Sequence, residues 1–310
     1  MRAKRIAVIM GGWSPERDVS LVSGRAACKA LEKLGHKVKT VDARRNLADQ
    51  LLNLFPSEMP DIVFNALHGE WGEDGCVQGL LEVMGLPYTH SGVLASALAM
   101  DKQRAKQALA AAGLPVPGGY LIRSPEEFAG LDIEAPYVVK PNASGSSVNI
   151  FIIREGDNRR VTDLIKDPAA FAEGVLVEPY IPGRELTVAV MGDRSLAVTE
   201  IIAHTDFYDY EAKYAAGGSS HIVPADLPAE ITQACLDLAL KAHQTLGCRG
   251  LSRTDFRFNE SLGINGLFIL ELNTQPGLTP TSLAPEQAAS LGISFEEMVD
   301  WMIGDASCRR

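Results

Sequence analysis

Several features that would place a chain in a specialised class are missing here. The apolar run near the start, Ile6 to Met10, has five residues, whereas a transmembrane helix needs roughly 20; it is also too short for a signal peptide. Basic residues are in deficit, with 29 Lys and Arg against 39 Asp and Glu. The resulting net charge of −10 argues against nucleic acid or an anionic membrane surface as the main partner.

Cysteine is scarce, and its spacing does not suit cross-linking. The five cysteines are scattered, odd in number and form no CxxC pair, which argues against a disulfide framework and a zinc site. Reduced thiols fit a cytoplasmic protein, and this is what we expect. The dinucleotide pattern GxGxxG, the Walker A pattern and a nucleophile elbow are also absent, so redox-cofactor chemistry and serine hydrolysis are not expected.

What is present is an ordinary globular composition with an α/β pattern. The chain has 310 residues, 46% of them hydrophobic, which is long for one core and predicts two or three subdomains. Apolar strands at Lys4–Met10, Lys37–Ala43 and Ile62–Leu67 alternate with helical segments. Over about the first 95 residues this alternation predicts βαβαβ units with a parallel sheet.

Two polar loops follow strands of this predicted sheet, where ligands of parallel sheets collect. The first, GGWSPERDVS, contains Glu16 directly before a helix. An acid at that position can complement the helix dipole or bind a substrate ammonium group, and the pattern leaves both open. His68 begins the second loop, HGEWGEDG, and is either a loop hydrogen-bonder or part of a site.

The segment that organises the chain is ELNTQPG, Glu271 to Gly277, read together with Asp255. Leu267 to Asn273 is apolar enough to be a strand, and TDFRF precedes it across an Asn- and Gly-rich turn that suits a hairpin. Glu271 and Asn273 leave one face of their strand, and pairing would bring Asp255 beside them. Three hard oxygen ligands then suit Mg²⁺ shared with phosphate. A solvated strand face is the alternative.

Two lysines are candidates for phosphate binding. Lys140 ends the strand Pro136–Pro141 and is followed by NASGSSVN, a loop whose backbone N–H groups and hydroxyls can cover phosphates. An ordinary hairpin turn is the alternative. Lys102 lies near the start of a helix over Asp101–Ala112, where it opposes the helix dipole. A solvated lysine is the alternative there.

The segment Val175–Val188 reads as strand, proline-broken connection and strand, which is typical of a linker between subdomains. Such hinges commonly receive adenine through backbone groups, and acids reach the ribose hydroxyls. Glu178 and Glu185 are the candidates for these contacts. Considered alone, both would be surface acids.

The stretch His204–His221 is long, aromatic-rich and without periodicity. Long loops of this kind are lids or binding loops, and Lys213 and Tyr214 would then face the reactants. An irregular loop packed on the surface is the alternative. A lid that excludes water over metal-bridged ATP suits phosphoryl transfer or the formation of an acyl phosphate.

Six motifs in this order and spacing resemble the D-alanine–D-alanine ligase family of the ATP-grasp superfamily over nearly the whole chain. They are GGWSPERDVS, HGEWGEDG, KPNASGSSV, FYDYEAKY, SRTDF and ELNTQPG. The resemblance implies an α/β, three-subdomain ATP-grasp fold with an N-terminal Rossmann-like parallel sheet. The implied parts are 1–97, an N-terminal domain; 98–181, a small central subdomain; and 182–310, a C-terminal subdomain with the lid, 204–221.

The same resemblance implies an activity and its setting. Two D-alanines would be joined with ATP, through a D-alanyl phosphate, to form the dipeptide used in peptidoglycan and cell-wall synthesis. Two Mg²⁺ or Mn²⁺ ions would be required. The protein would be a homodimer in the bacterial cytoplasm, with small-molecule substrates and no nucleic-acid or membrane partner.

Residue roles follow from the resemblance by motif match. Glu16 would hold the ammonium group of the first D-alanine, and His68 would line that subsite. Glu16, Ser146 and Tyr214 would form a hydrogen-bonded triad across the lid. Tyr214 or its network would help to deprotonate the second amine, which requires a shifted pKa for the tyrosine.

The remaining roles concern charge and the nucleotide. Arg253 and the N–H of Gly277 would stabilise the acyl phosphate and the tetrahedral oxygen, and Ser282 and Leu283 would hold the second carboxylate. The implied ATP contacts are Lys102, Lys140, Ser147 and Lys213 at the phosphates, Glu178 and Ile181 at adenine, and Glu185 at the ribose. The implied metal ligands are Asp255, Glu271 and Asn273.

Three rivals and two departures accompany this interpretation. The rivals are a relative that joins D-alanine to D-lactate or D-serine, another ATP-grasp carboxylate–amine ligase, and a nucleotide-binding regulatory module. Relatives that form depsipeptides tend to lose the lid tyrosine, so Tyr214 favours an amine acceptor. The departures are Asn149, where many relatives have glycine, and Trp13, a bulky residue in the first glycine loop.

Overall fold

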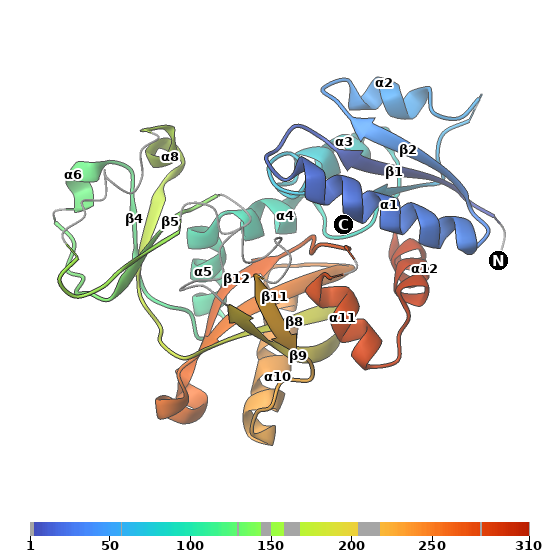
Figure 1. Ribbon diagram of the computed structural model, residues 1–310. Coiled ribbons are helices and arrows are strands. Elements are labelled where there is room, and N and C mark those ends of the chain that lie inside the picture. Colours follow the sequence, from blue (N-terminus) through green and yellow to red (C-terminus); the bar gives the residue numbers. More distant parts are fainter. Residues whose placement is uncertain are drawn as a thin grey trace.

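The computed structural model describes residues 3–56, 58–128, 130–143, 150–157, 168–203, 218–279 and 281–309. Within these ranges the strands form three sheets. Figure 1 shows an N-terminal sheet in blue and a small green sheet at opposite ends of the molecule, with the largest sheet between and below them. The candidate site lies where these three parts meet.

The N-terminal sheet is parallel, with strand order β2–β1–β3. Its elements are β1 (Arg5–Gly11), α1 (Arg17–Lys33), β2 (Lys37–Ala43), α2 (Leu47–Leu52), β3 (Ile62–Asn65) and α3 (Cys76–Met84). The alternation confirms the predicted βαβαβ arrangement. Because the strands are parallel, the loops after β1 and β3 leave the same edge, and these loops carry Glu16 and His68.

The small sheet is antiparallel, with order β4–β7–β5–β6. Its elements are β4 (Tyr120–Ile122), α6 (Pro125–Phe128), β5 (Tyr137–Pro141), β6 (Phe151–Ile153), α8 (Pro168–Glu173) and β7 (Val175–Pro179). Apolar residues on its strands, such as Ile122, Val139 and Val177, form its core. The predicted strands that end in Lys140–Pro141 and begin at Val175 are both present.

The largest sheet is also antiparallel, with order β10–β9–β8–β11–β12. Its elements are β8 (Arg184–Met191), β9 (Arg194–Ala203), β10 (Ser219–Ile222), α10 (Ala229–Thr245), β11 (Leu251–Phe258), the 3₁₀ helix η1 (Glu260–Gly266) and β12 (Leu267–Asn273). The predicted hairpin of β11 and β12 is confirmed, with η1 as its turn. The final residues of the predicted lid, from Ser219, form β10 rather than loop.

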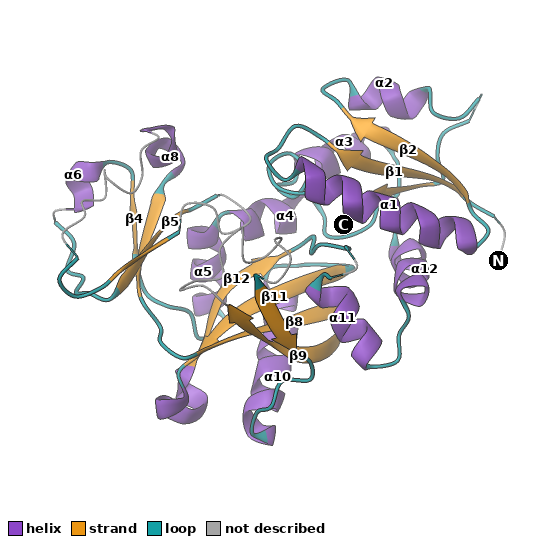
Figure 2. Ribbon diagram, viewed as in Figure 1, coloured by secondary structure: helices purple, strands orange, loops and turns teal. Residues whose placement is uncertain are grey.

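Two helices join this sheet from earlier in the chain. These are α4 (Val93–Met100) and α5 (Lys102–Ala111), whose residues Ala99, Ala105 and Leu109 share a core with α10 and with the buried face of β11 and β12. Figure 2 shows α4 and α5 next to β12. This packing places Lys102 against Glu271 of β12. The predicted boundaries at 97 and 181 stay predictions.

The chain ends by returning to its beginning. Helices α11 (Leu283–Ser290) and α12 (Phe295–Asp305) follow the largest sheet, and Met298 and Met302 of α12 pack in one core with Leu31 of α1. A capping box starts α12, because Ser294 accepts from the N–H of Glu297 while the Glu297 carboxylate accepts from the N–H of Ser294. Of the helices in the described ranges, none has the length and apolarity to cross a membrane.

Candidate active site

Four polar residues form a two-by-two array on one face of the β11–β12 hairpin. Arg253 pairs with Asn273, and Asp255 pairs with Glu271. Residues directly opposite each other in a ladder project to the same face, and residues two apart on one strand do so as well. The structure therefore brings Asp255, Glu271 and Asn273 together as the sequence predicted, and it adds Arg253 to the same face.

A β-bulge beside Asp255 aims this array away from the core. The register shifts there, so that Phe256 pairs with Ile269 while Asp255 pairs with Glu271. On β12 the odd-numbered residues face the core before the bulge, as the fully buried Ile269 shows. After the bulge the even-numbered residues do, as the buried Leu272 shows. Strict alternation would have put Glu271 on the same face as Ile269. Bulges commonly redirect side chains next to active sites in this way.

Each member of the array has a protein partner. Arg253 donates from Nε and Nη2 to the two oxygens of Asp255, at 2.8 and 2.7 Å, and Thr187 Oγ1 donates to Asp255 Oδ1 at 2.6 Å. Lys102 Nζ lies 3.4 Å from Glu271 Oε2. These cations offset the repulsion that two facing carboxylates would otherwise suffer.

The donor set of the array fits a magnesium or manganese ion. Two carboxylates and one amide oxygen are hard ligands of the kind that such ions prefer. The third candidate ligand is an amide, Asn273, whose Oδ1 accepts from the N–H of Gln275 at 2.7 Å. In the described part of the chain, no group of three or more His, Cys, Asp or Glu side chains is placed to hold a metal.

A buried cluster of charges lies next to the array. Glu178 on β7 is 2% exposed and forms ion pairs with Lys106 of α5 and with Lys140 of β5, the second at 2.8 Å. Lys102 and Lys106 are four residues apart, so they occupy one face of α5. The sequence analysis missed Lys106, although this spacing from Lys102 was a signal that could have found it.

The charges of this cluster influence one another. Burial lowers the pKa of Lys106 to about 7, aided by repulsion from Lys140 and opposed by Glu178. Burial also acts to lower the pKa of Lys140, but attraction to Glu178 and Glu271 outweighs it and the pKa is raised. For Glu178, burial acts to raise the pKa, but the two lysines outweigh it and the pKa is lowered. Glu178 is thus held as a carboxylate between two lysines.

A cavity opens between the small and the largest sheets beside this cluster. Its lining includes Lys140, Glu178, Ile181, Glu185, Asp255 and Glu271. The wall thus combines residues predicted for phosphate, adenine, ribose and metal. Apolar groups from β5 and β12 complete it, as expected of a pocket that receives a planar ring.

Arg257 holds the linker at the mouth of this cavity. Its Nε donates to the backbone oxygen of Ile181 at 3.0 Å and its Nη2 to that of Gly183 at 2.7 Å. Its guanidinium also lies 5.6 Å from the ring centre of Tyr180 and reaches Glu185 Oε2 at 3.5 Å. The predicted hinge is therefore anchored to β11, a role for Arg257 that the sequence analysis did not foresee.

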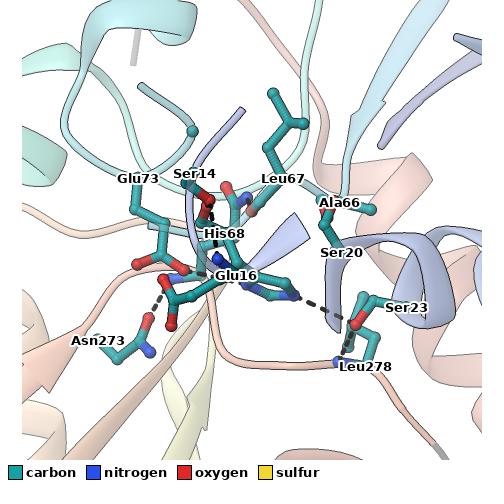
Figure 3. A network of polar contacts seen from close by, with 12 residues as sticks. Ser14, Glu16, Ser20, Ser23, Ala66, Leu67, His68, Glu73, Asn273 and Leu278 are labelled. Atoms are coloured by element: carbon teal, nitrogen blue, oxygen red, sulfur yellow. Dashed lines mark hydrogen bonds and ion pairs between the residues drawn. The ribbon is translucent and has the colours of Figure 1, made fainter. Parts of the chain in front are cut away.

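The loops that carry Glu16 and His68 lie together at the edge of the N-terminal sheet (Figure 3). Both residues are buried, at 8% and 6% exposure. Ser14 connects their loops, because its hydroxyl donates to the backbone oxygen of His68 at 2.7 Å and accepts from the N–H of Glu16 at 3.3 Å. Glu16 occupies the N-cap position of α1 without a side-chain capping bond. Its carboxylate is therefore not engaged in capping a helix N–H, while its place at the N-terminus still complements the helix dipole.

His68 is held at both ring nitrogens. Its Nδ1 lies 3.0 Å from Glu73 Oε1 and its Nε2 lies 3.2 Å from Ser23 Oγ. Ser23 also accepts from the N–H of Leu278 at 3.2 Å. Figure 3 shows Ser23 between the ring and this backbone. The loop of His68 is thus connected, through Ser23 of α1, to the segment that follows Asn273.

Comparison with known proteins agrees with this geometry. The family model described as D-ala D-ala ligase N-terminus matches residues 42–91, and the one described as D-ala D-ala ligase C-terminus matches residues 123–304. A D-alanine–D-alanine ligase of Cereibacter sphaeroides is 59% identical, with 99% of this chain and 97% of that protein covered. One from Parvibaculum lavamentivorans is 54% identical, with 100% and 99% covered.

This chain belongs to the D-alanine–D-alanine ligase family.

The predicted family and the predicted ATP-grasp fold are both confirmed. The solved D-alanine–D-alanine ligase of Bacillus anthracis superposes on this ligase with a TM-score of 0.82 at 31% identity, covering 98% of this chain and 97% of that one. The VanG D-Ala:D-Ser ligase of Enterococcus faecalis gives 0.80 at 29% identity, with 98% and 99% covered. An ATP complex of the B. anthracis enzyme gives 0.79 at 30% identity, with 98% and 97% covered.

Two tryptophans of the ligase lie in the loops that carry Glu16 and His68. Trp13 and Trp71 have ring centres 6.2 Å apart, and the Arg45 guanidinium lies 5.4 and 5.9 Å from them. Trp13 is 38% exposed. Trp13 is therefore accommodated at the surface by a tilted contact with Trp71, from the loop of His68, and by the guanidinium of Arg45.

Gly277, Ser282 and Leu283 lie where the chain leaves β12 and enters α11. Ser282 Oγ accepts from the N–H of Thr279 at 2.9 Å and bonds Thr279 Oγ1 at 2.7 Å. The Leu283 side chain is buried against Ile201, so only its backbone can meet a substrate carboxylate. The N–H groups of a first helical turn are suited to that contact.

Some predicted site residues lie outside the described residues. These are Ser146, Ser147, Lys213 and Tyr214, together with Asn149. Their predicted roles at the phosphates and across the lid stay predictions of the sequence. The rest of the predicted set lies in the described ranges, on the β11–β12 hairpin, among the buried charges around Glu178, on the linker, in the two N-terminal loops and between β12 and the start of α11.

Proposed function

We propose that the residues assembled here carry out the reaction of this family in the following way. The enzyme is an ATP-dependent ligase that joins two D-alanines through a D-alanyl phosphate, releases ADP and phosphate, and supplies peptidoglycan synthesis. The observation that carries the assignment of residues is the array of Arg253, Asp255, Glu271 and Asn273. It lies beside a lysine cluster and a cavity of suitable lining.

The first step brings two anions together. The carboxylate of one D-alanine attacks the γ-phosphate of ATP, and cations must screen both groups. Lys102, Lys140 and, from outside the described ranges, Lys213 would face the phosphates. Asp255, Glu271 and Asn273 would hold two Mg²⁺ or Mn²⁺ ions, which would neutralise phosphate charge when bound.

Glu16 would fix the first D-alanine by its ammonium group. A carboxylate at 8% exposure makes a stronger charge-assisted bond than one in open solvent. His68 would shape the subsite. Both of its ring nitrogens are engaged, with Glu73 and Ser23, so its proposed role is to orient the subsite rather than to transfer a proton.

The nucleotide would lie in the cavity between the two antiparallel sheets. Backbone groups at Ile181 would read adenine, and Glu185 would bind the ribose hydroxyls. Glu178 was predicted to read adenine as well. It is bound to Lys106 and Lys140 in this structure, so we add a second role for it, the neutralisation of two buried lysines next to the phosphates.

The second step joins the amine to the acyl carbon, and phosphate leaves. Arg253 would exchange its two bonds to Asp255 for oxygens of the acyl phosphate, aided by the N–H of Gly277. The first turn of α11, at Ser282 and Leu283, would hold the second carboxylate. Ser146 and Tyr214 would complete a triad with Glu16 and help to deprotonate the incoming amine.

The finer setting of the enzyme is also proposed. We propose a homodimer in the bacterial cytoplasm, with small molecules as substrates and no nucleic-acid or membrane partner. We also propose that its subdomains are 1–97, 98–181 and 182–310, with the lid over 204–221. Family resemblance supports these statements. The net charge of −10 supports only the proposed lack of a nucleic-acid or anionic-membrane partner.

An ADP-release assay tests the proposal. The purified enzyme is given ATP and Mg²⁺ with D-alanine, L-alanine, D-serine or D-lactate, and ADP and the ligated product are measured. We expect ADP and D-alanyl-D-alanine with D-alanine alone. Turnover that requires D-serine or D-lactate would replace the proposed acceptor, and ATP binding without any ADP release would identify a regulatory module instead.

A further inference from the structure

Two buried amide side chains connect the N-terminal sheet to the segment that carries the metal ligands. Asn65 ends β3 and is 0% exposed, and Gln275 follows β12 and is 1% exposed. Asn65 Nδ2 donates to Gln275 Oε1 at 2.8 Å, and Gln275 Nε2 donates to the backbone oxygen of Leu67. The two residues are 210 positions apart in the chain.

The orientation of both amides is determined by their partners. Turning the Gln275 amide over would set its oxygen against the Leu67 carbonyl and its NH₂ against the Asn65 NH₂. Asn65 Nδ2 also donates to the backbone oxygen of Gly72 at 3.0 Å, and Asn65 Oδ1 accepts from the N–H of Leu67 at 3.1 Å. A buried pair with this many directed bonds permits little sliding of one sheet past the other.

The pair lies between two substrate subsites. On one side, the Gln275 N–H donates to Asn273 Oδ1 at 2.7 Å, which orients a proposed metal ligand. On the other side, Asn65 shapes the turn at Leu67, directly before His68. We propose that Asn65 and Gln275 are a positioning pair, which sets the spacing between the first amino-acid subsite and the metal-ligand segment during ligation.

This inference rests on the proposed function, in which the first carboxylate must approach the γ-phosphate. Reacting atoms have to come within about 3–3.5 Å with correct alignment. The two subsites belong to different sheets, so covalent geometry does not determine their spacing. An apolar residue at position 275 would fill similar space, but it would leave the Asn65 amide and the Leu67 oxygen without their bonds.

The chain offers a matched control in Gln78. This buried amide, 1% exposed, donates to the same Gly72 oxygen at 2.8 Å, and both partners of this bond belong to the N-terminal part. Its Oε1 has no hydrogen-bond partner among the described residues. Gln78→Leu therefore removes a comparable buried bond without touching the connection to Gln275.

The test compares Gln275→Leu, Asn65→Leu, the double variant and Gln78→Leu by ADP release with D-alanine. We expect kcat to fall about 10- to 100-fold in Gln275→Leu, with KM for ATP within about twofold of the wild type. The double variant should lose no more than the worse single variant, as expected of two residues that act as a unit. Wild-type kcat in Gln275→Leu, or an equal loss in Gln78→Leu, would overturn the pair.

A second readout needs no activity. Gln275→Met keeps the side-chain length but removes the amide. The quantity measured is the hydrogen-exchange rate of the Leu67 N–H, which donates to Asn65 Oδ1. We expect faster exchange there in Gln275→Met and unchanged exchange in Gln78→Leu. Equal exchange in all three proteins would refute the positioning role. A wild-type enzyme that releases no ADP with D-alanine would instead refute the proposed function. The exchange rates would still show whether Gln275 holds Asn65 and the turn at Leu67 in place.

Discussion

Asp255 and Glu271 lie directly opposite each other across the β11–β12 ladder, next to a bulge. Two carboxylates in that relationship repel, which costs the fold a few tenths to about 1 kcal/mol. Arg253 and Lys102 offset the repulsion here. Two facing carboxylates that neighbouring cations hold together in this way are suited to a divalent cation.

The first prediction concerns Glu271→Gln. The change removes an anionic ligand and the repulsion of Asp255, but also the partner of the buried Lys102, so we expect the Tm to stay level or fall slightly while kcat falls at least about 100-fold. Added Mg²⁺ together with ATP should raise the Tm of the wild type more than that of the variant. Glu230→Gln, at an exposed acid in the first turn of α10, is the control. Equal turnover in Glu271→Gln and the wild type would remove Glu271 from the proposed site.

The second prediction compares two glycines with left-handed backbone. Gly69 has φ +72°, and a Cβ there would collide with the Glu16 carboxylate; Gly85 has φ +66° and open space around it. Both Ala substitutions should cost about 1–2 kcal/mol of stability for the backbone. Only Gly69→Ala should displace Glu16, so we expect its KM for D-alanine to rise about tenfold or more. Similar KM values in the two variants would separate Glu16 from substrate binding.

The third prediction follows from Lys106 and its pH dependence. The pKa of this lysine is 10.5 in its ordinary state and about 7 when folded. Between these values the unfolded chain binds more protons, so the contribution of Lys106 to the free energy of unfolding rises with pH. The slope is at most about 1.4 kcal/mol per pH unit.

Urea unfolding of the wild type and Lys106→Met between pH 7 and 9 isolates this contribution. We expect the wild type to gain stability relative to the variant as the pH increases. A difference that is constant over this range would show that Lys106 keeps its ordinary proton affinity in the folded enzyme. Lys241→Met, on the surface of α10, is a control that should show no such gain.

The fourth prediction concerns the stack of Arg45 on Trp13 and Trp71. Arg45→Ala removes two cation–π contacts, each about 0.5–1 kcal/mol at an exposed position. We expect both indoles to become more accessible to acrylamide, and KM for D-alanine to rise a few-fold because the two loops border the first subsite. Trp301 lies on α12 and should keep its quenching. Unchanged quenching overall would mean that Arg45 does not hold the loops.

Much of the local structure was predictable. The strands Lys37–Ala43 and Leu267–Asn273 have the predicted bounds, and Gly35 follows α1 with φ +84°, as a helix end requires. Their signals are local, because propensity and periodicity act within a few residues. The same holds for the side-by-side placement of Glu271 and Asn273, which depends only on strand alternation.

The sequence alone was therefore enough for the type of most elements, for the family motifs and for naming the candidate metal ligands, which stay predictions. The tertiary structure decided which face those ligands occupy, through a bulge that no alternation pattern reveals. It also decided that Glu178 meets Lys106 and that Asn65 meets Gln275. These choices depend on the packing of elements distant in the chain, because burial and charge pairing arise only when separate surfaces come together.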